Sequence, residues 1–315
     1  MNQKKSFLNH LICPVSHEPL RRVGEELISE KSNFVYPIKN GIPILIDESN
    51  SIFSIEEITN TSSTESPSIL SKIKSSITYF FPTIGNNFQG EENFNTLTEI
   101  LIEKNLSPKV LVIGGAWIGS GMESMINEKS ITLIETDIYL SERTDLICDG
   151  HSIPFEDGYF DGVIIQAVLE HVVDPFKCVD EIHRVLKKDG LIYSETPFMQ
   201  QVHMGKYDFT RFTHLGHRRL FRNFKELDSG IVCGPGMALA WSIQYFLLSF
   251  TTSLILRKFF VLFTNFIAFP FKYFDYFLKD KKGAYDSASG FFFLGTRSEE
   301  TLSDKDLIKL YRGAL

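Results

Sequence analysis

Polar side chains follow buried apolar runs in the middle of the chain. Asp149 begins an acidic turn, Asp161–Gln166 reads as a buried strand, and the polar loop Leu169–His171 comes directly after that strand. A helix and a further strand then follow. This order predicts a doubly wound α/β sheet, in which ligands bind at the carboxyl ends of the strands. Carboxylate and imidazole groups at that edge can accept hydrogen bonds from a ligand or exchange a proton with it.

The helix that must position this loop has a clear beginning and end in the sequence. Asp174 is placed to cap it, with Pro175 at its first position. Lys187 and Lys188 are expected in its last turn, and Gly190 ends it. Its apolar side chains recur at helical spacing at Phe176, Val179, Ile182, Val185 and Leu186.

These pieces recur in one order in a known family. The residues concerned are Asp149, Ile153–Phe155, Phe160–Asp161, Leu169–His171, Asp174–Pro175 and Arg184–Gly190. Together they resemble the motifs of class I methyltransferases that use S-adenosylmethionine, in the branch that includes the ubiquinone and menaquinone methyltransferases. A single motif would carry little weight, whereas the ordered set is specific. The resemblance implies a Rossmann-like sheet, S-adenosylmethionine as the cofactor, and methyl transfer as the reaction.

The resemblance also implies a cofactor site that combines a glycine-rich loop with polar strand ends. In the family, the counterpart of Asp137 accepts hydrogen bonds from both ribose hydroxyls, and the counterpart of Asp149 accepts one from the adenine amino group. The backbone of Gly150 or His151 would flank the adenine ring, while Gln166 and the Leu169–His171 loop would line the methionine and methyl end. The full set of expected cofactor residues is Gly114, Gly115, Gly119, Asp137, Asp149, Gly150, His151, Gln166 and His171.

Each of these assignments has a purely structural alternative. Asp137 can be a solvated strand end, Asp149 can cap a turn, and His171 can tie its loop to the backbone. The glycine-rich loop also departs from the family, because Val112 stands where an acidic residue is usual and Trp117 separates the glycines. A dinucleotide fingerprint fits worse, since its third glycine is missing, which argues against a nicotinamide oxidoreductase.

A second polar segment, after the fifth strand, resembles the acceptor loop of these enzymes. His203, Asp208 and Arg211 match its pattern, and Tyr207 lies beside them. His203 and Tyr207 are candidates for contact with a small-molecule or lipid-linked acceptor. His203 is also the candidate general base, because imidazole titrates near neutral pH. Asp208 and Arg211 are candidates for the same catalytic site or, alternatively, an ion pair that holds the loop.

Residues 1–48 predict a small β-rich module. Asn40–Gly41 between two apolar runs is a hairpin signal. The stretch resembles the zinc-ribbon-derived domain related to the activator subunit of tRNA methyltransferases. Structural zinc needs four ligands, whereas His10, Cys13 and His17 supply at most three. We therefore expect a module without zinc, and we assign no metal site to the rest of the chain.

An apolar segment, 237–285, separates the core from a last strand and a C-terminal helix in 286–315. It holds many of the 28 Phe residues of the chain at helical spacing. We expect a helical insertion between the last two strands. A true membrane span would put the two halves of one sheet on opposite sides of a membrane, which backbone hydrogen bonding forbids. Peripheral membrane contact through 237–279 and packing against the domain or a dimer partner both remain open.

The remaining organisation follows from composition. Residues 49–92 read as a Ser/Thr-rich linker with an amphipathic helix at Ile69–Phe80, and 93–236 read as the cofactor-binding core. The formal charge of −7 argues against nucleic-acid binding, and four scattered cysteines suit a reducing cytoplasm. We expect a cytoplasmic enzyme, at the inner face of a membrane if the insertion binds lipid, that can form homo-oligomers. The alternative is a non-catalytic, membrane-associated or scaffold protein with a degenerate methyltransferase fold.

Overall fold

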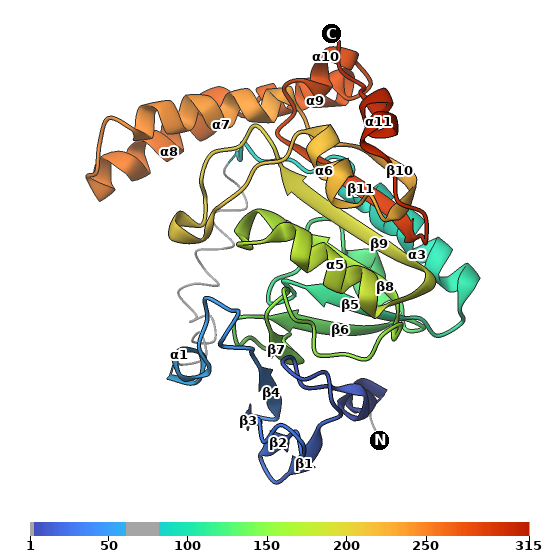
Figure 1. Cartoon of the computed structure of the whole chain (residues 1–315). Helices are drawn as coiled ribbons and strands as arrows, with labels where there is room; N and C mark the ends of the chain where they lie inside the picture. The colour runs from blue at the N-terminus through green and yellow to red at the C-terminus, as the bar shows by residue number, and fades with distance from the viewer. Residues whose placement is uncertain (1–2, 61–81, 315) are drawn as a thin grey trace.

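The computed structural model describes residues 3–60 and 82–314, which form one continuous sheet with helices on both faces (Figure 1). The strands pair in the order β1 (Arg21–Val23), β2 (Glu26–Ile28), β3 (Val35–Lys39), β4 (Ile42–Leu45), β7 (Leu146–Cys148), β6 (Thr132–Asp137), β5 (Lys109–Ile113), β8 (Phe160–Gln166), β9 (Leu186–Pro197), β11 (Gly290–Arg297) and β10 (Phe224–Cys233). The strands from β4 to β9 in this order are parallel, and β11 runs antiparallel between β9 and β10. The predicted Rossmann-like sheet is confirmed.

Buried side chains alternate between the two faces of the central strands. Val110 and Val112 of β5 belong to one hydrophobic cluster, with α3 and α4, whereas Leu111 and Ile113 belong to another, with α5 and α6. Burial on both faces explains why this strand is apolar at every one of these positions. The helices outside the insertion are α1 (Ile55–Asn60), α3 (Gly90–Lys104), α4 (Glu123–Asn127), α5 (Pro175–Val185), α6 (His214–Leu220) and α11 (Asp304–Leu307).

Helix α5 begins where the sequence predicts but ends earlier. The Asp174 carboxylate accepts hydrogen bonds from two backbone N–H groups of the first turn, and Pro175 is the first residue of the helix. The prediction that Lys187 and Lys188 lie in its last turn is wrong, because both residues belong to β9. The first residue of β9 already pairs with Phe160 of β8. Pairing with the sheet therefore overrides the helical spacing.

The N-terminal module extends the central sheet of the core. Strands β3 and β4 form the hairpin predicted at Asn40–Gly41, and both of these turn residues have positive φ. Strand β4 then pairs in parallel with β7 of the core. Leu11 and Tyr36 of the module share one buried cluster with Phe155 of the core. The amphipathic helix predicted at Ile69–Phe80 lies outside the described residues.

Cys13 of the module is held by protein groups. Its Sγ lies 3.2 Å from the hydroxyl of Tyr36 and accepts a hydrogen bond from the backbone N–H of Ser16 at 3.4 Å. The hydroxyls of Ser29 and Ser32, on the facing turn, are hydrogen-bonded to each other. The thiol of Cys13 thus has two polar partners within the module.

The predicted insertion between β10 and β11 is helical. Its helices are α7 (Pro235–Leu248), α8 (Leu254–Ala268), α9 (Phe271–Leu278) and α10 (Lys282–Tyr285). Helix α7 packs on both α8 and α9, and the α7–α8 hairpin projects from the body of the molecule (Figure 1). Within the described ranges no single helix is long and apolar enough to cross a membrane. Helices α8 and α9 taken together are long and apolar enough, with a bend of 46° between them.

Asp275 of α9 anchors this helix to the start of α7, close to the end of β10. Its buried carboxylate accepts hydrogen bonds from the backbone N–H groups of Gly236 (2.7 Å) and Met237 (3.0 Å), at the start of α7. Asp275→Ala leaves these donors without their acceptor, so we expect it to lower the free energy of unfolding by about 2 kcal/mol. Urea denaturation would measure the change. The exposed Asp280, in the turn after α9, provides the control: Asp280→Ala should change little, and equal losses would contradict the anchoring role.

Candidate functional site

A cavity of about 480 Å³ opens at the carboxyl ends of the parallel strands. Its wall is mostly apolar and aromatic, which is typical of small-molecule sites of this size. Of the predicted cofactor residues, the wall includes Gly114, Gly119, Asp137, Gln166 and His171. Gly115, Asp149, Gly150 and His151 do not line it. The structure therefore brings together about half of the predicted set.

The glycine-rich loop after β5 brings backbone close to the cavity. Gly114 has a φ of +81°, and a Cβ there would lie 2.3 Å from Cγ2 of Val168. A Cβ on Gly119 would lie 1.7 Å from Oε1 of Gln166, whereas one on Gly115 would face Glu135 of β6 instead. Glycine is therefore required at 114, where φ is positive and the opposite wall is close, whereas at 119 the contact is with the far end of the flexible Gln166 side chain.

Asp137 ends β6 and lies on the cavity wall with 8% of its surface exposed. Its carboxylate accepts hydrogen bonds from the backbone N–H groups of Ala116 (3.0 Å), Ile138 (2.7 Å) and Tyr139 (3.0 Å). Burial raises the pKa of Asp137, although these three donors lower it. A carboxylate has about four acceptor positions, so roughly one remains for a ligand hydroxyl. Asp137 thus holds the glycine-rich loop through Ala116 and also presents its carboxylate to the cavity.

The carboxylate of Asp149 contacts protein groups and not the cavity. Its carboxylate accepts hydrogen bonds from the Ser51 hydroxyl (2.5 Å) and from the backbone N–H of His151 (3.0 Å), and it contacts Nδ1 of His151 at 2.5 Å. Burial raises the pKa of Asp149, but the hydrogen bonds from His151 and Ser51 outweigh that effect and lower it. The backbone N–H of Asp174 in turn donates to Nε2 of His151. In this conformation the residue has the turn-capping role, which explains why it does not face the cavity.

Two polar residues of the cavity wall, Glu195 and Asn87, are absent from the predicted set. Glu195 of β9 pairs in register with Gln166 of β8 and accepts hydrogen bonds from Nδ2 of Asn87 (2.9 Å) and the hydroxyl of Tyr193 (2.5 Å). Burial raises its pKa. The sequence did offer a signal for Glu195, because it is a carboxylate near the end of a predicted strand, as Gln166 is at the end of its own strand. Asn87 gave none, since it lies in segment 49–92, which the sequence assigns to a linker with an amphipathic helix.

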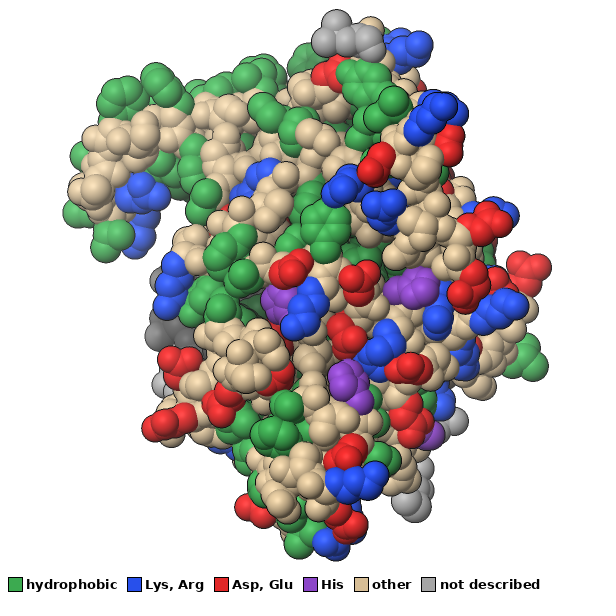
Figure 2. Space-filling model, viewed as in Figure 1, with side chains coloured by type: hydrophobic (Ala, Val, Ile, Leu, Met, Phe, Trp, Pro, Cys, Tyr) green, Lys and Arg blue, Asp and Glu red, His purple; other side chains and the backbone are tan. Residues whose placement is uncertain are grey.

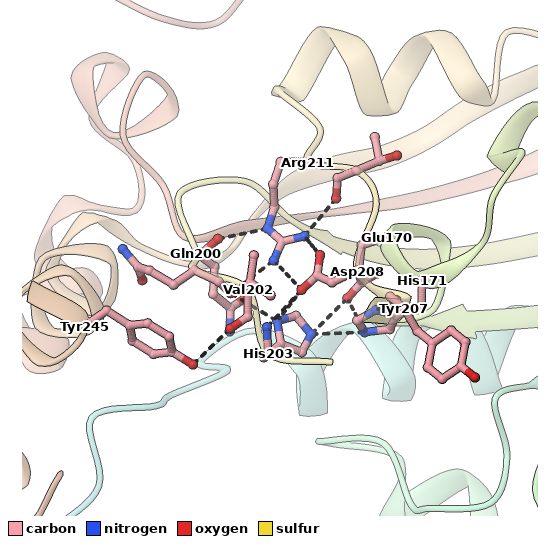
Figure 3. A network of polar contacts seen from close by, with 11 residues as sticks. Glu170, His171, Gln200, Val202, His203, Tyr207, Asp208, Arg211 and Tyr245 are labelled. Carbon is pink, nitrogen blue, oxygen red and sulfur yellow. Dashed lines mark hydrogen bonds and ion pairs between the residues drawn. The ribbon is translucent and has the colours of Figure 1, made fainter. Parts of the chain in front are cut away.

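His171 and His203 both line the cavity, and Figure 3 shows their imidazole rings beside each other. Their Nε2 atoms are 3.0 Å apart, and Oε1 of Glu170 lies 3.6 Å and 3.7 Å from them. Nδ1 of His171 donates to the backbone carbonyl of Tyr207 at 2.8 Å. The Glu170 carboxylate raises the pKa of His203. His203 and Tyr207, both predicted for the acceptor side, therefore line the cavity beside His171.

Asp208 and Arg211 stabilise the loop that carries His203. They form a bidentate ion pair, and Asp208 also accepts a hydrogen bond from the backbone N–H of His203 at 2.9 Å (Figure 3). Burial would raise the pKa of Asp208, but Arg211 and the backbone N–H lower it to about 2. Neither residue lines the cavity. The geometry favours the loop-holding alternative for this pair over direct catalysis.

Comparison with known proteins gives matches in two parts of the chain. A methyltransferase domain model matches residues 126–194, and a Trm112p-like protein model matches residues 4–41. A UPF0434 protein of Vesicomyosocius okutanii is 52% identical over 44 residues, which are 14% of this chain and 75% of that protein. Ubiquinone/menaquinone biosynthesis C-methyltransferase UbiE of Citrifermentans bemidjiense is 52% identical over 40 residues, which are 13% of this chain and 17% of that enzyme.

One similar solved structure is Haemonchus contortus phosphoethanolamine N-methyltransferase 2 in complex with S-adenosyl-L-methionine. It is 17% identical, the match covers 69% of this chain and 55% of that chain, and the TM-score is 0.39. The chain thus spans three quarters of a UPF0434 protein and less than a fifth of the C-methyltransferase.

Proposed function

We propose that this chain, which belongs to the S-adenosylmethionine-dependent methyltransferases and carries a Trm112p-like module at its N-terminus, methylates a lipid-linked acceptor at a membrane surface. S-adenosylmethionine is its cofactor. The cavity fits this group: its backbone-lined loop, the buried Asp137 and the amide of Gln166 suit a polar nucleoside and an amino acid end. Oε1 of Gln166 is buried and has no hydrogen-bond partner among the described residues, which leaves an acceptor for a ligand donor.

The observation that carries the lipid-linked acceptor is a contact between the acceptor loop and the insertion. The hydroxyl of Tyr245, on α7, donates to the backbone carbonyl of Val202 at 3.0 Å, one residue before His203 (Figure 3). Gln201 likewise contacts Ser242 of α7 at 3.2 Å. The polar end of the cavity and the projecting hairpin are therefore directly connected. An acceptor with an apolar tail would reach both at once.

The surface of the hairpin suits a membrane. Phe250, Leu254 and Ile255 at its tip are 70%, 75% and 80% exposed, and Figure 2 shows hydrophobic side chains along the projecting helices. Segment 237–285 carries six Lys or Arg and two Asp residues, although the whole chain has a formal charge of −7. Exposed aromatic side chains with nearby basic residues are typical of helices that lie in the interface of an anionic bilayer.

The chain's own residues need to do little covalent chemistry. The cofactor supplies a methyl group on an activated sulfonium. Holding donor and acceptor in line contributes roughly 7–11 kcal/mol of the barrier reduction in favourable cases. His203 and Tyr207 would orient the acceptor, and the ion pair of Asp208 with Arg211 would keep His203 in place. Burial of the site among apolar side chains would exclude water.

The proposal predicts methyl transfer into lipid. Incubation of the protein with methyl-labelled S-adenosylmethionine and vesicles made from a bacterial total lipid extract should place label in the organic phase. Phe250→Ser with Ile255→Ser removes two exposed apolar side chains from the hairpin tip. We expect this double variant to bind anionic vesicles at least tenfold more weakly and to lose lipid labelling, while its affinity for S-adenosylmethionine is unchanged.

Leu106, 84% exposed in the loop after α3, supplies the matched control. Leu106→Ser should bind vesicles like the unaltered protein. If the label stayed in the aqueous phase, the result would contradict a lipid-linked acceptor and favour a soluble small molecule. Cofactor binding with no transfer to any fraction would instead favour the non-catalytic scaffold.

A further inference from the structure

Three potential metal ligands meet on the cavity wall. Glu170, His171 and His203 each offer one ligand atom, and these atoms all lie within 4.8 Å of one another. Glu170 and His171 come from the short 3₁₀ turn η2 (Leu169–His171) after β8, and His203 comes from the loop after β9. Two elements far apart in sequence thus bring two imidazoles and one carboxylate to one point (Figure 3).

The hydrogen bonds of the two imidazoles fix which nitrogen is free. Nδ1 of His171 faces the carbonyl oxygen of Tyr207 at 2.8 Å, and Nδ1 of His203 faces the carbonyl oxygen of Gln201 at 3.3 Å. A carbonyl oxygen only accepts, so each Nδ1 carries the hydrogen. In the neutral rings both Nε2 atoms then present lone pairs, and they face each other at 3.0 Å. Two lone pairs at that distance repel unless a proton or a cation lies between them.

Glu170 supplies the second, independent observation. Its side chain is fully buried, and neither carboxylate oxygen has a hydrogen-bond partner among the described residues. Leaving a buried carboxylate without donors is costly, whereas a bound cation would neutralise it. Its Oε1 is also the nearest negative charge to both Nε2 atoms, at 3.6 Å and 3.7 Å.

We propose that Glu170, His171 and His203 bind a divalent transition-metal cation. Bonds of about 2.1 Å from one cation to both Nε2 atoms would subtend roughly 90° at the observed nitrogen separation, and roughly 120° to Oε1. Two His and one carboxylate form a donor set that suits zinc, iron, manganese or cobalt and leaves coordination positions open. The backbone carbonyls that hold each Nδ1–H supply the outer contacts that metal-bound histidines usually have.

The open positions would face the cavity that His171 and His203 line. An acceptor with a hydroxyl oxygen could bind the cation there and lose its proton more readily. This role rests on the proposed function, whereas binding of the cation does not. In that case His203 acts as a metal ligand, and the cation replaces it as the group that activates the acceptor.

Cation binding can be measured without cofactor or acceptor. Full-length protein without a polyhistidine tag, stripped with chelator, would be titrated calorimetrically with Zn²⁺ and Mn²⁺, and with Co²⁺ followed by its visible absorption. We expect one cation per chain with micromolar or tighter affinity, and a cobalt spectrum that reports nitrogen ligands. Glu170→Gln and His203→Gln should each weaken binding at least 100-fold.

The double variant His10→Gln, His17→Gln serves as the control, because it removes two histidines near Cys13 in the N-terminal module. It should bind the cation like the unaltered protein. Thermal melts of every variant would show that the fold is retained. Absence of binding up to millimolar cation would overturn the proposal and leave a shared proton between His171 and His203. Binding that survives both Glu170→Gln and His203→Gln, or that is lost in the control, would equally overturn it.

Discussion

Asp137→Asn is expected to weaken S-adenosylmethionine binding by about 100-fold. The carboxylate accepts three backbone hydrogen bonds, among them one from Ala116 in the glycine-rich loop, and it retains room for a ligand hydroxyl. The amide of asparagine places donor hydrogens where these groups need an acceptor. The change therefore removes a ligand contact and loosens the loop at once. Calorimetric titration with S-adenosylmethionine and S-adenosylhomocysteine would measure both affinities.

Asp161 offers a matched control for this prediction. Asp161 is a partly buried carboxylate that likewise accepts a backbone hydrogen bond, from Lys109, but it lies at the opposite end of the parallel strands. Asp161→Asn should lower thermal stability and leave the cofactor affinity unchanged. If Asp137→Asn bound the cofactor normally, Asp137 would be a structural strand end, and the ribose would need another partner.

Leu11→Ala is expected to destabilise the whole described fold by about 2–5 kcal/mol, although Leu11 lies in the N-terminal module. Its side chain is 1% exposed and belongs to the same buried cluster as Phe155 of the core. Trp117 and Trp241 are the two tryptophans of the chain, and both lie outside the module. Their fluorescence during urea denaturation should therefore report the loss, with a single transition at lower urea concentration.

The corresponding control is Val23→Ala, in the edge strand β1, where the side chain is 41% exposed. It should shift the transition by less than about 0.5 kcal/mol. A tryptophan transition that stays unchanged in Leu11→Ala would show that the module unfolds independently. The continuous sheet would then contribute no shared stability.

The sequence predicted the central fold well because local signals and tertiary packing agree there. Strand β5 is apolar on both faces, and Asp174 with Pro175 marks the start of α5. Where they disagree the prediction fails, as at Lys187, which pairing with β8 draws out of the helix and into β9. The joining of β4 to β7 could not be predicted, since a parallel edge between distant segments leaves no local pattern.

The candidate site was predictable only where the place of a residue along a strand fixes its position in the fold. Asp137 and Gln166 end strands and therefore lie at the ligand edge. Asp149 also follows a strand, yet Ser51 comes from a segment 98 positions earlier in the chain to occupy its carboxylate. The approach of His203 to His171 depends likewise on the path of a long loop. Such contacts depend on tertiary geometry that spacing along the chain does not record.

The ends of the helical insertion are adjacent in the sheet, since Cys233 of β10 and Gly290 of β11 are register partners. The segment between them therefore leaves the sheet and returns to it at one pair of residues, and the pairing of β10 with β11 continues beyond that pair. Lengthening, shortening or exchanging residues 234–289 need not disturb the strands that hold Asp137 and Gln166. The cost of closing such an excursion grows only slowly with its length. Evolution, or an engineer, could therefore change the surface that the insertion presents while the strand ends that line the cavity stay as they are.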